Sequence, residues 1–259
     1  MIKFNVNEIF GPTIQGEGVD AGTPSMFLRT NGCNLRCSFA DSICDSPYSS
    51  FVPDTTAACT PEEACQIVCK LFDEYPYVPD LIITGGEPFL QGAGLEHFIG
   101  LFRNQFPHKC ITIETNGTMC TVSEPILNQI HLISISPKLS NSATSKPGIP
   151  ESVTVTHNRN RINHGACAQL INHCRNFQIK FVWSHNSDET EIQQYLYDLA
   201  KVSQTPLTCL NQHVLIMPEG ATNDQMSTSA QSAVDCCIRN GWRYTDRLQI
   251  RIWGDKRGV

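Results

Sequence analysis

The sequence predicts an α/β protein in which outer helices cover a sheet of parallel strands. Three observations support this fold class. Short apolar strand patterns alternate with helix patterns along the 259 residues. Polar segments containing glycine, proline or asparagine follow the strands. Helical segments with recognisable start or stop signals separate the strands, as the crossovers of a parallel sheet require.

The first predicted helix begins after Thr60, which can cap it. Pro61 suits the first helical position, and Glu63 completes a capping box. An apolar stripe follows at Ala64, Ile67, Val68 and Leu71. Residues 80–84 then have a buried-strand pattern that ends at a glycine pair, and a helix is expected near 92–106.

The middle of the chain continues the alternation. A strand is predicted at 110–114, and a helix near 121–130 leads into a strand at 131–136 that stops at Pro137. Residues 140–160 are rich in Ser, Asn, Thr and Pro, so we predict a loop or an excursion from the fold there.

The last third supplies two more strand–helix pairs. A strand is predicted at 177–182 and a helix near 188–202. A strand at 213–217 and a helix at about 222–240 follow, and Gly241 suits a left-handed helix cap.

Polar loops fall at the carboxyl ends of four of these strands. In α/β sheets function gathers at those ends, so we expect the loops to surround one opening. The loops are Thr84–Glu87, Glu114–Gly117, Ser136–Lys138 and Met217–Gly220.

Composition limits the function classes. Nineteen Lys and Arg against twenty-five Asp and Glu give a net charge of −6, which favours a small-molecule partner over a nucleic acid. The first residues lack the apolar core of a signal peptide, and no apolar run approaches the roughly 20 residues that cross a bilayer. We therefore expect a cytoplasmic protein with no membrane partner.

Thirteen cysteines are unusual for such a protein, and without an export signal they predict reduced thiols. Cys65 and Cys69 lie four apart in a helix pattern, where they could face one another as ligands, although ordinary core packing is the preferred interpretation. Cys236 and Cys237 are adjacent on a helix and diverge. Scattered single cysteines beside apolar residues make up most of the remainder: Cys59, Cys110, Cys120, Cys167, Cys174 and Cys209.

Three cysteines form a different group. Cys33 and Cys37 lie four apart, and Cys44 follows seven residues later. Three thiolates from one loop can hold a [4Fe–4S] cluster and leave one iron open for a chelating cosubstrate. Spacing alone also allows a structural zinc site with a fourth ligand, or three unrelated thiols.

The segment Gly85-Gly86-Glu87-Pro88 lies downstream of these cysteines at a predicted strand end. Together the two motifs resemble the radical S-adenosylmethionine (SAM) superfamily. The resemblance implies a partial (incomplete) β/α barrel formed by one domain over residues 1–259, with a loop excursion at about 140–175. It also implies that the glycine-rich segment meets the amino group of SAM.

Further motifs narrow the resemblance. Residues 10–18 (FGPTIQGEG), 27–29 (FLR), 44–48 (CDSPY), 136–140 (SPKLS) and 253–259 (WGDKRGV) look like the 7-carboxy-7-deazaguanine synthase family. The resemblance covers residue 8 to the last residue, and 140–175 is the least matched part.

This resemblance implies a reaction and its cofactors. The family converts 6-carboxy-5,6,7,8-tetrahydropterin to 7-carboxy-7-deazaguanine with loss of ammonia, using SAM, a [4Fe–4S] cluster and Mg²⁺. The deoxyadenosyl radical takes a hydrogen from C6 of the pterin, and SAM is regenerated after ring contraction. An electron donor such as flavodoxin or ferredoxin and a homodimeric assembly are also implied.

The resemblance also assigns roles to residues. The cluster ligands would be Cys33, Cys37 and Cys44, and Ser46 would bind Mg²⁺ in place of the family's usual threonine. The substrate would be bound by Ile14, Gln15, Gly16, Arg29, Thr84 and Val259. SAM would be bound by Ile43, Asp45, Gly86, Glu87, Glu114, Ser136, Pro137, Lys138, Met217, Pro218, Glu219 and Gly220.

Two features depart from the family pattern. The superfamily separates its cysteines by three and then two residues, whereas here the gaps are three and six, so residues 40–43 are partly or wholly an insertion. Ile43 consequently stands where an aromatic residue is usual. Gln249 replaces a histidine of the last strand, and an amide cannot titrate near neutrality.

Two other functions compete with this assignment. One is a different radical SAM enzyme, such as an activase that forms a glycyl radical on a partner protein. The other is a non-catalytic zinc-binding module. The sequence leaves open whether a deazaguanine product would serve tRNA or DNA modification.

Overall fold

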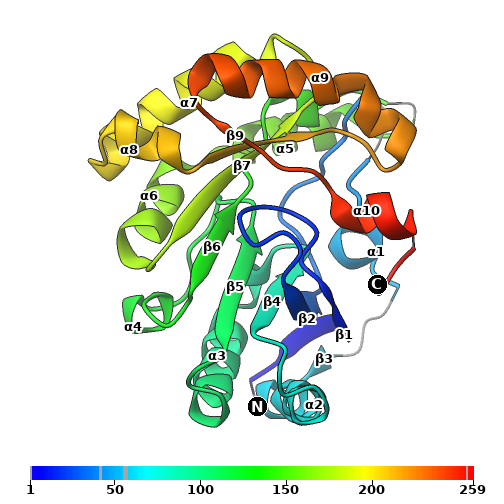
Figure 1. Ribbon diagram of the computed structural model, residues 1–259, viewed down its shortest axis with the longest axis vertical. Coiled ribbons are helices and arrows are strands. Elements are labelled where there is room, and N and C mark those ends of the chain that lie inside the picture. Colours follow the sequence, from blue (N-terminus) through cyan, green and yellow to red (C-terminus); the bar gives the residue numbers. More distant parts are fainter. Residues whose placement is uncertain (1, 41–42, 55–57, 147, 255) are drawn as a thin grey trace.

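A curved sheet of nine strands runs through the residues that the computed structural model describes, which are 2–40, 43–54, 58–146, 148–254 and 256–259 (Figure 1). Its strand order is β3-β1-β2-β4-β5-β6-β7-β8-β9. The strands are β1 (Phe4–Ile14), β2 (Pro24–Thr30), β3 (Ala58–Cys59), β4 (Asp80–Gly85), β5 (Cys110–Thr115), β6 (Leu132–Ile135), β7 (Phe177–Trp183), β8 (Val214–Pro218) and β9 (Arg243–Tyr244).

The sheet is parallel from β2 to β9, and β1 adds an antiparallel edge that also pairs with β3. Parallel pairing brings the carboxyl ends of β2 and β4 to one edge, where Arg29 lies opposite Thr84 and Thr30 opposite Gly85. The predicted parallel α/β sheet is therefore confirmed, and its end strands β3 and β9 do not pair with each other within the described residues.

Helices follow the convex side of the sheet in an arc from α2 through α3, α4 and α6 to α7 and α9 (Figure 1). The arc leaves one side to α1, α10 and the C-terminus, as expected of an incomplete barrel. The helices are α1 (Pro47–Ser50), α2 (Pro61–Glu74), α3 (Ala93–Gln105), α4 (Glu124–Leu127), α5 (Glu151–Asn160), α6 (His164–His173), α7 (Asp188–Ser203), α8 (Leu207–Gln212), α9 (Asn223–Asn240) and α10 (Leu248–Trp253).

Local sequence signals set the ends of several helices. The capping box of Thr60 and Glu63 forms at the start of α2, with Pro61 in the first helical position. Gly241 caps α9 in the left-handed conformation with a φ of 69°. These two predictions are confirmed.

Each central strand divides its side chains between two environments. On β7, Ile179, Phe181 and Trp183 are buried in the apolar core under the helices. Gln178 and Lys180 alternate with them and are buried on the opposite face, inside the barrel. The apolar face of the strand therefore anchors the sheet, and its polar face supplies the interior of the barrel.

The predicted loop excursion at 140–175 is wrong for most of that segment, because α5 and α6 occupy it. Helix α6 connects β6 to β7 and buries Cys167, Leu170 and Ile171. The polar composition that suggested a loop belongs to a helix, α5, that buries one side chain, His157.

The long N-terminal strands were not predicted from periodicity, since β1 is half-exposed and its pairing is interrupted near Gly11-Pro12. The described helices include no segment with the length and apolar character needed to span a membrane.

Candidate active site

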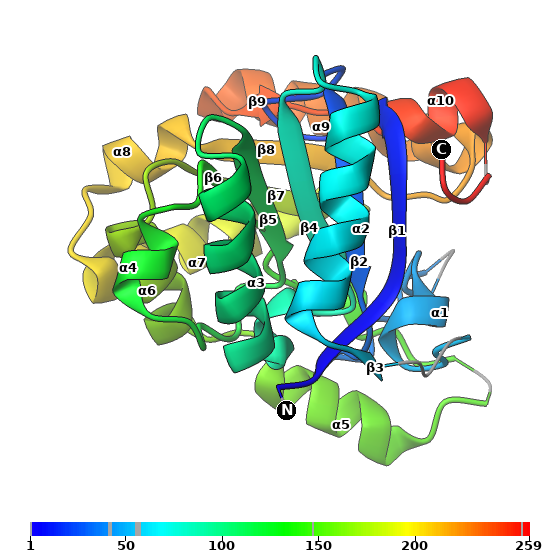
Figure 2. The same ribbon diagram turned by 90° about the horizontal axis from the view of Figure 1, so that it is seen from below.

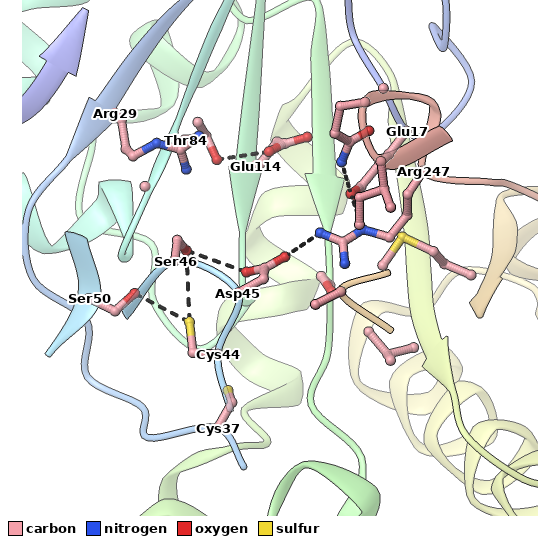
Figure 3. Close-up of a pocket in the computed structure, with 18 of the residues that line it drawn as sticks. Glu17, Arg29, Cys37, Cys44, Asp45, Ser46, Ser50, Thr84, Glu114 and Arg247 are labelled. Carbon is pink, nitrogen blue, oxygen red and sulfur yellow. Dashed lines mark hydrogen bonds and ion pairs between the residues drawn. The ribbon is translucent and has the colours of Figure 1, made fainter. Parts of the chain in front are cut away.

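A cavity of about 350 Å³ opens at the carboxyl ends of the parallel strands. Every site residue predicted above lines it except Glu87 and Pro137. Its volume is in the range of a small-molecule pocket. Figure 3 shows three groups of side chains around it: Cys37 and Cys44 with Ser46, then Arg29 with Thr84 and Glu114, and then Glu17 with Arg247.

The cysteine loop is closed by its own backbone. The Cys44 N–H donates to the Cys37 carbonyl at 3.1 Å, and Ser38 pairs with Ile43 in an antiparallel bridge. These two contacts join the ends of the long gap and keep Cys37 beside Cys44. Asp41 and Ser42 of the predicted insertion lie outside the described residues.

The surroundings of Cys33 suit a cluster ligand. Its Sγ accepts hydrogen bonds from the Leu35 N–H at 3.4 Å and from Asn116 Nδ2 at 3.9 Å. Hydrogen bonds of this kind to sulfur orient and tune iron–sulfur ligands. Among the described residues, no three His, Cys, Asp or Glu side chains lie close enough to hold a single metal ion. A cubane separates its thiolates more widely than one ion does, so three cysteines facing one cavity fit a cluster.

Burial governs the protonation of these thiols. It raises the pKa of Cys33 to about 11 and that of Cys37 to about 12, and Lys138 partly opposes both shifts. Without a metal both thiols are therefore protonated near neutrality, and cluster assembly must release their protons.

Gly86 is required by packing against the cysteine loop. A Cβ there would overlap the carbonyl oxygen of Gly32. The adjacent Glu87 N–H donates to that same carbonyl at 2.8 Å. The glycine thus lets the end of β4 touch the backbone that leads into Cys33.

Glu87 was predicted to contact SAM, but it is not part of the cavity lining and its side chain is fully buried. It accepts from the Phe89 N–H at 3.1 Å, the Asn116 N–H at 2.8 Å and the Thr115 hydroxyl at 2.8 Å. Burial nevertheless raises its pKa to about 7. Glu87 therefore ties the end of β4 to the end of β5.

Pro137 also lies outside the cavity lining, whereas its neighbours Ser136 and Lys138 are part of it. The Lys138 ammonium donates to the Ser136 hydroxyl at 2.8 Å. Of this loop, these two flanking residues are the ones that line the cavity.

Arg29 and Glu114 face the cavity together. Arg29 Nε donates to Glu8 at 2.8 Å, but its terminal nitrogens have no hydrogen-bond partner in the part of the chain that the structure describes. Glu114 accepts from Thr84 Oγ1 at 2.8 Å and from Gln15 Nε2 at 3.2 Å. Glu114 was predicted to bind SAM, yet it contacts two predicted substrate residues.

Ser46 lies between the cysteines and Arg29 (Figure 3). Its hydroxyl is 3.4 Å from Asp45 Oδ1 and 3.8 Å from Cys44 Sγ. A hydroxyl beside a carboxylate is a pair of hard oxygen ligands of the kind that Mg²⁺ takes.

The lengthened loop also places Phe39 in the cavity wall, 8% exposed, together with Ile43. An aromatic ring therefore reaches this wall from the loop, although Ile43 itself is aliphatic.

A group of buried charges was missed by the sequence analysis. Glu17 bonds to Lys180 and accepts from Arg247 Nε at 2.9 Å and from Gln249 Nε2 at 2.8 Å. Burial alone would raise the pKa of Glu17, but the two cations hold it well below its usual range. A lysine inside the apolar strand at 177–182 was the available signal, because a charge there needs a partner.

Arg247 joins three distant segments. Besides Glu17 it donates to Asp45 Oδ2 at 2.5 Å and to the Gly220 carbonyl at 2.7 Å. Burial opposes its charge, but Glu17 and Asp45 together raise its pKa. Arg247 is the N-cap residue of α10, and Gln249 lies within that helix, so the expected position of Gln249 in a last strand is wrong.

The C-terminal tail reaches the cavity, where Val259 forms part of the lining. Arg257 anchors the tail by donating to Glu8 at 3.1 Å and to Asn7 at 2.8 Å, and its guanidinium lies 3.8 Å from the centre of the Tyr48 ring. These contacts place the end of the chain on the same wall as Arg29.

Comparison with known proteins shows the family to which the chain belongs. The model of a 4Fe-4S single cluster domain matches residues 14–154, which places the chain in the class of iron–sulfur cluster proteins. The chain is 32% identical to a 7-carboxy-7-deazaguanine synthase of Halobacterium salinarum, over 96% of this chain and 90% of that one. It is 33% identical to the synthase of Rhodopirellula baltica, over 95% and 85%. The chain belongs to the 7-carboxy-7-deazaguanine synthase family.

A solved structure supports the fold. The crystal structure of QueE from Escherichia coli superposes with a TM-score of 0.62 at 20% identity, covering 95% of this chain and 94% of that one. The predicted partial β/α barrel is confirmed by this likeness and by the observed strand order.

Proposed function

We propose that the protein is a radical SAM enzyme that converts 6-carboxy-5,6,7,8-tetrahydropterin to 7-carboxy-7-deazaguanine with release of ammonia. One observation carries the proposal. A single cavity contains the three cysteines of the cluster motif and, across from them, the Arg29, Thr84 and Glu114 side chains (Figure 3). Family membership supplies the reaction that such a cavity would perform.

The cysteine wall would hold the cluster on Cys33, Cys37 and Cys44. When bound, the cluster and SAM supply the radical that removes a hydrogen atom from the substrate. Lys138, Gly86 and the Met217–Gly220 segment line the same cavity and would hold SAM. Gly86 presents backbone without a side chain, which allows close approach.

The opposite wall suits a pterin carboxylate. Arg29 has two terminal nitrogens directed away from its Glu8 contact, and a planar guanidinium binds a carboxylate with two parallel hydrogen bonds. The Glu8 carboxylate accepts a hydrogen bond from Arg29 Nε and so fixes the plane of the guanidinium.

Glu114 can accept from the ring N–H and amino groups of a pterin, and Gln15 and Thr84 orient its carboxylate. Ser46, with Asp45 beside it, would bind Mg²⁺ between the two walls. Val259 and Ile14 would close the substrate side.

Partners and location follow from the same proposal. An electron donor such as flavodoxin or ferredoxin would reduce the cluster, and the family resemblance favours a homodimer. All thirteen cysteines are free thiols, which fits a reducing, cytoplasmic location.

Anaerobic turnover of the reconstituted protein with the carboxytetrahydropterin, SAM, Mg²⁺ and a chemical reductant such as dithionite tests the proposal. Formation of 7-carboxy-7-deazaguanine supports it. The variant Arg29→Gln should bind the substrate about 10- to 100-fold more weakly, because one charged, bidentate contact is lost. SAM cleavage without a deazaguanine product would point to another radical SAM reaction. Colourless protein with bound zinc would overturn both the proposed reaction and any other radical SAM reaction.

A further inference from the structure

We propose that His157 is a positioning residue that holds the backbone of the cluster loop between Cys33 and Cys37. The inference rests on the proposed function in taking these cysteines as cluster ligands. It concerns α5, which lies in the segment that matches the family least and which the site described above does not use. Figure 2 shows α5 set apart from the helices that cover the outer face of the sheet.

His157 is the buried side chain of this otherwise polar helix, with 1% of its surface exposed. Its Nδ1 accepts a hydrogen bond from the Arg36 N–H at 3.2 Å. Arg36 immediately precedes Cys37, so the histidine contacts the loop beside a predicted ligand. A buried imidazole that accepts from a loop amide restrains that amide directly.

The second ring nitrogen fixes the tautomer. His157 Nε2 is 3.0 Å from the Ser142 hydroxyl, and that hydroxyl donates its proton to the Leu139 carbonyl at 2.6 Å. Ser142 must therefore accept from Nε2–H, which leaves Nδ1 as the acceptor that the Arg36 amide requires. Burial lowers the pKa of His157 to about 4, so the ring stays neutral near pH 7.

The backbone around Ser142 holds the loop at a second point. The Ser38 N–H donates to the Ser142 carbonyl at 2.7 Å, and the Thr144 N–H donates to the Ser38 carbonyl at 2.8 Å. The loop is thus bound on both sides of Cys37, at residues 36 and 38, by one segment. We infer that Ser142, Thr144 and His157 brace the loop whose cysteine gap is lengthened.

Ordinary core packing is the competing explanation for a buried histidine. Packing requires only the ring, whereas a brace requires the acceptor at Nδ1. Two substitutions separate these roles. His157→Asn keeps an acceptor at the position of Nδ1 but loses the bond to Ser142, and His157→Gln keeps a donor toward Ser142 but loses that acceptor.

Amide hydrogen exchange of the metal-free protein over residues 34–39 tests the brace without using the cluster. His157→Gln and His157→Phe should exchange about tenfold faster, because the Arg36 amide loses its acceptor. His157→Asn should remain within about threefold of the wild type. Val155→Ala, at an exposed position of the same helix, is the control. Alkylation of Cys37 in the same samples should follow the same order.

Reconstitution then gives the functional readout. The iron content and the intensity of the spectroscopic signal of the reduced cluster with SAM should be lower in His157→Gln than in the wild type. Both should be close to the wild-type values in His157→Asn, and the two variants should have similar thermal stability. Equal exchange in His157→Gln and His157→Asn would overturn the brace. Because the exchange measurement uses metal-free protein, it decides the brace even if the chain proves to have no radical SAM activity.

Discussion

Two walls of the cavity, the one formed by the cysteines and the one around Glu17, are held together in different ways. The cysteine wall is built from backbone hydrogen bonds, such as that from Cys44 to Cys37, and burial keeps the Cys33 and Cys37 thiols neutral until a metal arrives. The wall around Glu17 is built from charged side chains that are already paired, with Lys180 and Arg247 bound to one carboxylate.

The difference reflects what each wall has to do. Thiols that will bind a cluster need a fixed backbone and an open space beside them, because the iron atoms that they bind arrive only after folding. Charges that stay in a buried position need their partners at once, since an unpaired buried ion is costly. The cavity therefore combines a wall that awaits its ligand with a wall that is complete in the protein itself.

The largest expected effect is on the cysteine wall. Cys44→Ala should reduce the iron content of the reconstituted protein to background and abolish turnover, because two thiolates cannot hold the cluster in place. Cys209→Ala, on α8 and away from the cavity, is the matched control and should behave as the wild type. Full iron content in Cys44→Ala would show that another residue is the third ligand.

A substitution in the wall around Glu17 should lower the stability of the protein instead of its iron content. Glu17→Gln leaves Lys180 and Arg247 without their shared carboxylate, and we expect a loss of about 3–5 kcal/mol in unfolding free energy. Chemical denaturation of the metal-free protein measures it. Glu189→Gln, which breaks an exposed pair with Arg239, is the control and should cost much less. Similar losses in both variants would remove the distinction between the walls.

Gly86→Ala tests the contact between β4 and the cysteine loop. The added methyl group overlaps the Gly32 carbonyl, so the backbone must shift at a cost of about 1–3 kcal/mol. Cluster incorporation should fall with it, measured as iron per chain. Gly100→Ala is a suitable comparison, because open space surrounds that glycine in α3. An unchanged iron content in Gly86→Ala would refute the packing role.

The smallest effect is expected at the other end of β4, away from both walls. Burial raises the pKa of Asp80 to about 7, so the folded state keeps a proton that the unfolded state releases near pH 4. Stability should therefore fall as the pH rises from about 4 to 7. Asp80→Asn cannot ionise and should gain about 1–2 kcal/mol at pH 8 and little at pH 4. A pH-independent difference would contradict this assignment.

Regular periodicity predicted the fold well where strands are buried on both faces. The strands at 80–84, 110–114 and 177–182 and the helix after Thr60 all form as expected. Periodicity failed at β1, whose half-exposed pattern depends on pairing with β2, and at α5, whose one buried side chain contacts the cysteine loop.

The sequence by itself determined the cluster motif, because Cys33, Cys37 and Cys44 lie within one short segment and their chemistry can be read locally. It also determined which strand ends carry polar loops. Only the tertiary structure decided that Glu17, Lys180 and Arg247 meet, that the Glu87 carboxylate binds Thr115 and Asn116, and that His157 contacts the cluster loop. These contacts join residues that are far apart in the chain, and burial and charge pairing select them only once the sheet has curved.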